Sequence, residues 1–348
     1  RYSTMTGKLP SRSVYSREIN KNHHISSVTI PTSKIQSTDG TCEFENLAQN
    51  LQIAYTGEYR TGMFGKWHLS KTDDASYTYQ SSVEKIKKCG FDTVDGLYVE
   101  NMMNDGWYGD DQFSHNMEWI TSNAVDFINY NQSDAYNWKK EKKPFFMYFN
   151  PTAPHSSRSV REALRGFSCR KTPNGTLSGD FDFGIYSQIP NVGNVTNCSE
   201  YRETIFQRAG ETASDKDLGS VWVDDSIGVL LQTLKNNNIL NNTVIIFQLD
   251  HGMKSKNTLF ENGVKIPQFI HYPNLISPNT KSDLLVSTFD VAPTLFYFAK
   301  MSSCSFYKTD GKAWKDTLTS VNEKFFWKAR KCVFFEYDMD RGECEAEI

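Results

Sequence analysis

The sequence lacks several features that would assign it at once to a large class of proteins. No apolar run is long enough to cross a membrane, and a net charge of −3 does not favour nucleic acid or an anionic membrane as the main partner. None of the seven cysteines forms a C-x-x-C pair, so we expect no structural zinc site. Repeats and low-complexity tracts are missing too, and a chain that is 38% hydrophobic and 14% aromatic is not disordered.

The length of the chain predicts more than one structural unit. Its 348 residues exceed what one hydrophobic core usually serves. We expect a large domain over residues 1–318 and the start of a smaller C-terminal unit over 319–348, which opens with a strand from Lys331 to Glu336. The first residue, Arg1, is not a start methionine, so we expect the chain to begin inside a longer protein.

One stretch, from Thr243 to Glu261, organises the rest of the chain. It begins with the apolar run Val244 to Phe247, which is short and rich in β-branched residues. Such a run predicts a strand that is buried on both faces.

The polarity of this stretch changes abruptly after the strand, at Asp250 and His251. Open α/β sheets place their sites at the carboxyl ends of strands. A carboxylate, an imidazole and a following cation, Lys254 or Lys256, would suit a metal ion together with an anion. The alternative is a strand that ends in an ordinary solvated turn.

A second stretch, from Gly57 to Ser70, follows the same order of strand, break and polar residues. Lys66 and His68 stand two apart, so in an extended segment they point the same way while Trp67 faces the core. They would then line one pocket. The alternative is an exposed lysine and a hydrogen-bonded histidine beside a core tryptophan.

A third stretch combines a buried strand, Phe145 to Phe149, with the turn T-A-P-H that ends at His155. Proline restricts the backbone on both sides of itself, so such a turn can hold an imidazole in place, although a surface histidine is an equal alternative. Together the three stretches suit an ester of an oxyanion: cations for its oxygens, imidazoles for proton transfer and a hard metal ion.

Between these stretches, residues 156–210 predict a long, irregular polar surface loop. A Cys169–Cys198 bridge is possible there, but the spacing does not establish it. Asp224 and Asp225 precede a helix face, and we expect them to be surface charges that favour the helix dipole.

Sequons of the form N-x-S/T give weak support to a glycoprotein of the secretory pathway, either extracellular or lysosomal. They occur at Asn131, Asn174, Asn194, Asn197 and Asn241.

The same stretches resemble the formylglycine-dependent sulfatases of the alkaline phosphatase superfamily. G-E-Y-R-T-G-M-F-G-K-W-H-L is similar to the family pattern G-Y-x-T-x-x-x-G-K-W-H-L, and T-A-P-H to its A-P-H turn. L-D-H-G followed by K-N-T-L-F-E-N-G-V-K-I-P is similar to S-D-H-G or S-D-N-G followed by K-x-T-x-Y-E-G-G-x-R-x-P, and D-V-A-P-T-L matches a later segment. Departures include Ser70 for glycine, Gln248-Leu249 for Thr-Ser and Asn262 for glycine.

The resemblance implies a fold and an activity. The fold would be α/β, with a large mixed, mostly parallel β-sheet sandwiched between helices and the start of a small C-terminal α+β subdomain. The activity would be hydrolysis of an organic sulfate ester by a formylglycine hydrate and one calcium ion. R-Y-S-T-M-T-G-K-L-P looks like the continuation of the C-x-P-S-R pattern from its arginine. We therefore expect the residue that becomes formylglycine, and further metal ligands, upstream of Arg1, and we expect these 348 residues to be inactive alone.

Roles carry over by matching residues. Asp250 and His251 would bind calcium, and Lys66 and Lys256 would bind sulfate oxygens. Three further catalytic residues are then implied. His68 would accept a proton from the formylglycine hydrate, and His155 would contact the sulfate or protonate the leaving oxygen. Arg1 would hold the formylglycine end of the site.

The implied partners are a sulfated small molecule or sulfated glycan and, for the complete chain, a formylglycine-generating enzyme. Two alternatives remain: a phosphodiester or phosphonate hydrolase of the same superfamily, and a non-catalytic sulfatase-like binding protein. The K-W-H pattern favours the sulfatase.

Overall fold

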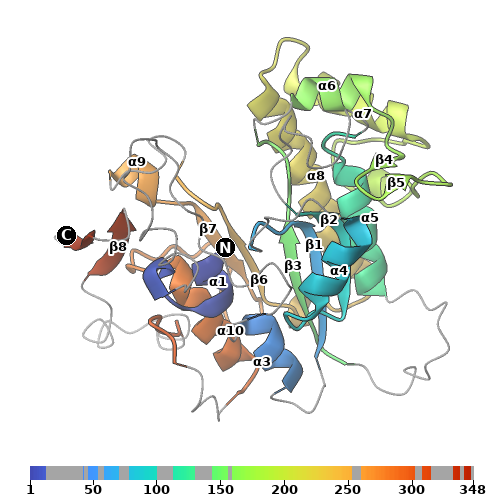
Figure 1. Cartoon of the computed structure of the whole chain (residues 1–348). Helices are drawn as coiled ribbons and strands as arrows, with labels where there is room; N and C mark the ends of the chain where they lie inside the picture. The colour runs from blue at the N-terminus through green and yellow to red at the C-terminus, as the bar shows by residue number, and fades with distance from the viewer. Residues whose placement is uncertain are drawn as a thin grey trace, which may run out of the picture.

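The computed structural model describes residues 1–12, 42, 46–53, 59–69, 78–99, 113–129, 143–155, 159–252, 260–301, 308–314, 332–337 and 341–345. Its architecture is the predicted mixture of helices and strands, with helices on both sides of a parallel sheet (Figure 1). No helix in these ranges has both the length and the apolar character that crossing a membrane requires.

A three-stranded parallel sheet lies at the centre of the larger group of elements. Its order is β2-β1-β3, with β1 at Arg60–Lys66, β2 at Thr93–Tyr98 and β3 at Phe145–Asn150. The strands predicted in the stretch from Gly57 to Ser70 and at 145–149 are thus present. All six residues of β3 are half-buried, however, so the prediction that this strand is buried was wrong. Side chains alternate across β1, so Met63 and Phe64 belong to two different hydrophobic clusters on opposite faces of the sheet.

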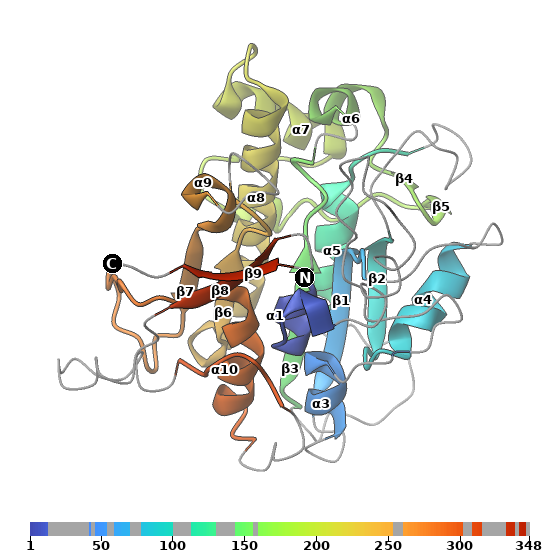
Figure 2. The same ribbon diagram turned by 60° about the vertical axis from the view of Figure 1, so that its left-hand side comes forward.

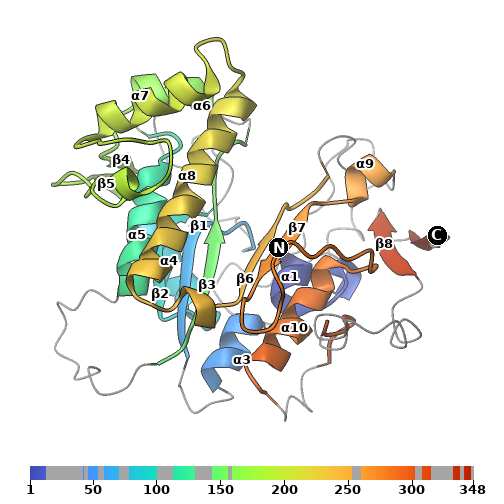
Figure 3. The same ribbon diagram turned by 180° about the vertical axis from the view of Figure 1, so that it is seen from behind.

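One face of the sheet packs against two long helices, α5 at Met117–Asn129 and α8 at Asp215–Asn236. The other face is covered by shorter helices that contribute to the second cluster; Figures 1 and 3 show α1, α3 and α10 grouped there. These helices are α1 (Tyr2–Thr6), α3 (Leu47–Ile53), α4 (Tyr79–Lys87) and α10 (Val291–Phe298). Helices on both faces of a parallel sheet confirm the predicted α/β class.

The remaining strands form separate antiparallel pairs in the described part of the chain. β6 (Ile245–Gln248) pairs with β7 (Gln268–His271), and β8 (Val333–Tyr337) pairs with β9 (Arg341–Glu345), as Figure 2 shows. The predicted strand at 244–247 is therefore present. All four residues of β6 are half-buried, however, so the prediction that this strand is buried on both faces was wrong: its one described partner strand is β7.

The segment 156–210 is more ordered than the predicted surface loop. From residue 159 it contains α6 (Val160–Gly166), the short pair β4 (Lys171–Thr172) and β5 (Gly175–Thr176), and α7 (Cys198–Ala209). A Cys169–Cys198 disulfide joins the start of α7 to the chain after α6, with 6.4 Å between the Cα atoms. Apolar side chains spaced among the polar ones, such as Phe183, Tyr201 and Phe206, bury the segment against α5 and α8. A second disulfide, Cys42–Cys89, lies beside the other cluster.

The expectation that Asp225 is a surface charge was wrong, whereas Asp224 is exposed as expected. Both lie well inside α8, which begins at Asp215, so the expectation that they favour the helix dipole was also wrong. Asp225 is buried in α8 and accepts hydrogen bonds from the Tyr201 hydroxyl and from both terminal nitrogens of Arg208. The pattern of α8 alone could not reveal these partners, because both are on α7. An aspartate paired in this way can be buried without an uncompensated charge.

Asp215 links α8 to α6 and makes stability depend on pH. Its carboxylate accepts hydrogen bonds from the backbone amides of Val160 and Arg161, at 2.9 and 3.2 Å. Partial burial acts to raise the pKa of Asp215, but hydrogen bonds from Ser159 and these amides outweigh it and lower the pKa below 3.8. The stabilisation is therefore full above the unfolded-state pKa and is lost as the pH falls through the lowered one.

We expect Asp215→Asn to reduce the free energy of unfolding by about 1 kcal/mol at pH 7, since it weakens a helix-capping contact. Denaturant unfolding at pH 7 and at pH 3 should show the difference shrinking at the lower pH. Asp180→Asn, at an exposed aspartate, is the control and should change stability little. An equal loss at both pH values would contradict the electrostatic origin.

Candidate functional site

The carboxyl ends of β1 and β3 meet at one edge of the sheet. Gly65 pairs with Asn150 in the parallel register, so Lys66 follows directly beside the end of β3. Gly65 has a φ of 93°. Its backbone lies so close to β3 that a Cβ atom at this position would clash with the carbonyl oxygen of Asn150. Only glycine allows this approach, which fixes where Lys66 emerges.

The K-W-H segment leaves the sheet in a strained conformation. Trp67 is fully buried, as predicted, and Lys66 is only 5% exposed. The amides of Trp67 and His68 continue the pairing with β2 by donating to the carbonyls of Tyr98 and Val99. His68 itself has φ of 56°, so the extended alternation that would point it the same way as Lys66 does not hold at this residue. A non-glycine residue in the left-handed region is uncommon, and such residues gather at functional sites.

His155 ends a tight turn after β3. Its amide donates to the Thr152 carbonyl at 3.1 Å, and the Ala153–Pro154 peptide bond inside the turn is cis. His155 is half-buried. A buried histidine that sequence reasoning missed, His115, contacts both ends of this turn.

Asp250 and His251 follow β6 and remain accessible, with side chains 52% and 40% exposed. Nδ1 of His251 lies 2.8 Å from the carbonyl oxygen of Gly252. That oxygen can only accept, so Nδ1 carries the hydrogen in the neutral ring and Nε2 keeps its lone pair. Nε2 is 3.7 Å from Oδ1 of Asp250. This donor set, one carboxylate and one imidazole lone pair, fits two ligands of a divalent cation.

Arg1 lies at the same site. Its Nη1 is 3.8 Å from Oδ2 of Asp250. Within the described residues its Nε is buried and has no hydrogen-bond acceptor. Burial raises the pKa of the Tyr148 hydroxyl on β3. The charge of Asp250 also acts to raise this pKa, and the charge of Arg1 acts to lower it. Figures 1 to 3 place the N-terminus level with the arrowhead of β3.

Gln248 fixes α1 against the end of β6. Its Nε2 donates to Oγ1 of Thr4 at 2.7 Å, and its Oε1 accepts from Nε2 of Gln268 on β7 at 3.0 Å. The helix that begins after Arg1 is therefore tied to the strand that precedes Asp250. The sequence marked Gln248 only as a departure from the family pattern.

The structure pairs Arg1 with Asp250, places Lys66 beside the end of β3, and places His155 on the turn that follows that strand. Lys256, together with the other lysine considered, Lys254, lies outside the described residues.

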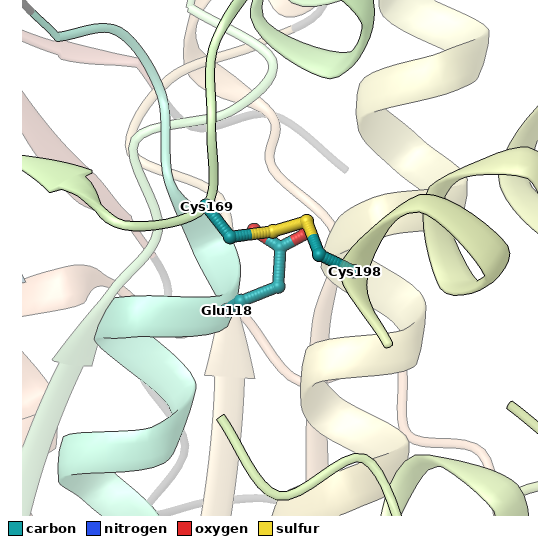
Figure 4. Close-up of side chains that lie close together, drawn as sticks. All are labelled: Glu118, Cys169 and Cys198. Atoms are coloured by element: carbon teal, nitrogen blue, oxygen red, sulfur yellow. A yellow bond between two sulfur atoms is a disulfide. The ribbon is translucent and has the colours of Figure 1, made fainter. Parts of the chain in front are cut away.

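A second group of metal-type ligands does not form a site. Glu118, Cys169 and Cys198 have ligand atoms within 4.8 Å of one another (Figure 4). The two sulfurs form a disulfide and so are not thiolates. Both carboxylate oxygens of Glu118 accept hydrogen bonds from Arg202. The group therefore stabilises the fold and leaves Asp250 and His251 as the candidate metal ligands in the described part of the chain.

A family model described as Sulfatase matches residues 2–301. The chain belongs to the sulfatase family. It is 26% identical to the arylsulfatase of Clostridium perfringens over 293 residues, which cover 81% of this chain and 57% of that protein. It is 27% identical to the N-acetylglucosamine-6-sulfatase of Bos taurus over 182 residues, covering 49% and 31%. The chain thus spans less than two thirds of each of these relatives.

Solved structures agree on the fold. A protein bound to its substrate D-glucosamine-2-N,6-O-disulfate superimposes with a TM-score of 0.56 at 18% identity, covering 96% of this chain and 72% of that one. The sulfatase PsFucS1 from Pseudoalteromonas sp. gives 0.53 at 18% identity, covering 97% and 64%. The sulfatase fold is therefore common to this chain and these enzymes, and sulfatases generally use a metal ion.

Proposed function

We propose that the complete protein hydrolyses organic sulfate esters, with a formylglycine hydrate as nucleophile and one calcium ion. The observations that support this most are the ion pair between Arg1 and Asp250, the place of Lys66 beside the end of β3, and the turn after β3 that ends at His155. A site of cations and imidazoles around a carboxylate suits a sulfate group, whose charge grows on the departing oxygen during cleavage.

Each residue then has a distinct part in the proposed reaction. Lys66 and Lys256 bind sulfate oxygens, and burial of Lys66 strengthens that contact because less water screens it. His155 contacts the sulfate or protonates the leaving oxygen, and His68 accepts a proton from the nucleophile. The buried, unsatisfied Nε of Arg1 supports a contact from this side chain to an oxygen at the formylglycine end.

Calcium would be held by Asp250 and His251 and would supply positive charge that stabilises the nucleophile. Two ligands are too few, because calcium takes roughly six to eight, mostly oxygens. A C-x-P-S-R or S-x-P-S-R pattern is also missing from these 348 residues. The proposal therefore includes further ligands and the formylglycine precursor from residues upstream of Arg1, and a formylglycine-generating enzyme to convert it.

The domain division also stays a proposal: a catalytic domain over 1–318 and a C-terminal subdomain from 319. The family match ends at residue 301, and β8 and β9 pair with each other. The boundary lies outside the described residues. Limited proteolysis that cleaves near residue 319 and leaves the larger piece folded would support it, and cleavage elsewhere would not.

The proposed substrate class is a sulfated glycan, since relatives are named for N-acetylglucosamine-6-sulfate and for ulvan. We expect a chain extended upstream of Arg1 to release sulfate from an aryl sulfate and from a sulfated hexosamine. Chelation with EGTA should abolish turnover, and calcium should restore it. Faster hydrolysis of the matching aryl phosphate would overturn the proposal in favour of a phosphoester hydrolase. No turnover of either ester would favour a binding protein.

The proposed localisation is the secretory pathway. The two disulfides suit an oxidising compartment. Sequon asparagines are exposed at Asn174, Asn194, Asn197 and Asn241, while Asn131 lies outside the described residues. Enzymatic deglycosylation of the protein secreted from eukaryotic cells should lower its mass; an unchanged mass would contradict glycosylation.

A further inference from the structure

A buried histidine, His115, joins the segment before α5 to the turn that ends at His155. The exposed fraction of His115 is 1%. Nδ1 lies 3.1 Å from Oγ1 of Thr152, and Nε2 lies 3.2 Å from the backbone carbonyl oxygen of His155. One imidazole therefore contacts the first and the last residue of the turn.

The partners of His115 fix its tautomer. The His155 carbonyl can only accept, so Nε2 of His115 donates to it, and in the neutral ring Nδ1 accepts from the Thr152 hydroxyl. Each ring nitrogen thus holds a different end of the turn.

Helix α8 also packs on this turn. A Cβ added to Gly219 would lie 2.6 Å from Cβ of Pro154, so the helix backbone itself packs on the proline. Both α8 and His115 therefore contact the turn that ends at His155. The half-buried imidazole of His155 extends from this fixed point.

We infer that His115 is a positioning residue for His155. By fixing the His155 carbonyl it sets where the His155 imidazole lies relative to a bound sulfate ester. The inference rests on the proposed function, in which His155 acts on that ester. Displacement of a reacting group by roughly 1 Å can cost about 100-fold in rate.

Two conservative variants separate the two contacts of His115. Glutamine places its amide nitrogen near the Nε2 position and retains a donor to the His155 carbonyl. Asparagine reaches the Nδ1 position and retains only the Thr152 contact. In the complete protein we expect His115→Asn to lower kcat by about 10- to 100-fold with KM within about 3-fold. His115→Gln should keep kcat within about 3-fold.

A double-mutant cycle tests whether His115 acts through His155. Once His155→Ala has removed the imidazole, adding His115→Asn should lower kcat by no more than about 2-fold. If the two substitutions instead lowered kcat by independent factors that multiply in the double variant, the inference would be overturned, because His115 would then stabilise the fold in general.

Hydrogen exchange supplies a readout that does not need activity. The His155 amide, bonded to the Thr152 carbonyl, should exchange faster in His115→Asn than in His115→Gln. Equal exchange in the two variants would overturn the positioning of the turn. Absence of turnover in the wild-type protein would overturn the proposed function and the catalytic part of the inference together. Normal turnover with independent losses in the cycle would overturn the inference alone.

Discussion

Replacing Lys66 by methionine is expected to lower kcat/KM for a sulfate ester by about 100- to 1,000-fold in the complete protein. Loss of one preorganised charged contact to the reacting group typically costs about 3–4 kcal/mol of transition-state stabilisation. Lys66 is buried beside the end of β3, so water cannot easily take its place at the sulfate oxygens. Methionine keeps an unbranched apolar side chain of similar length, which preserves the packing of the stem.

The control for this variant is Lys87→Met, at a partly exposed lysine in the last turn of α4 that pairs with Glu84. It should leave kcat/KM within about 2-fold, because exposed ion pairs contribute little. Steady-state kinetics and thermal unfolding of both variants would separate lost catalysis from lost folding. Near-normal turnover by a folded Lys66→Met protein would remove Lys66 from the site and weaken the proposed function.

Replacing Glu118 by glutamine is expected to reduce the free energy of unfolding by about 3–5 kcal/mol. Glu118 is fully buried on α5, and both of its oxygens accept hydrogen bonds from Arg202 on α7, at 2.9 and 3.1 Å. Burial acts to lower the pKa of the Arg202 guanidinium, but the charge of Glu118 outweighs it and raises the pKa. Glutamine leaves that guanidinium charged and buried without a counter-charge, which is the source of the cost.

An ion pair at the surface serves as the control that separates the effect of burial from the effect of losing one charge. Arg165 and Glu211 form an ion pair at 2.8 Å with side chains 54% and 62% exposed. Glu211→Gln should therefore cost less than about 1 kcal/mol in the same denaturant titration. Replacing both members of the buried pair, with Glu118→Met and Arg202→Met, should cost less than Glu118→Gln alone, because no unpaired charge remains. Equal costs for the buried and the surface variant would contradict the argument.

Much of the fold followed from local patterns. The strands β1 and β6 were predicted because an apolar run, and the polar or glycine residue that breaks it, act within a few residues. The same locality explains the errors. The sequence predicted an irregular loop over residues 156–210 because the apolar side chains there are spaced without a regular period. In the described part, from residue 159, only the faces of α5 and α8 complete the core of this segment.

The sequence by itself determined the family and the strand ends at which candidate site residues occur, because motifs such as K-W-H and D-H-G are contiguous. Tertiary structure alone decided which distant groups meet. It paired Asp225 with Arg208, Glu118 with Arg202, and His115 with the turn of His155. The physical reason is that a buried polar group needs a partner but not one at any fixed separation along the chain. Only the packing of helices and strands brings the two groups together.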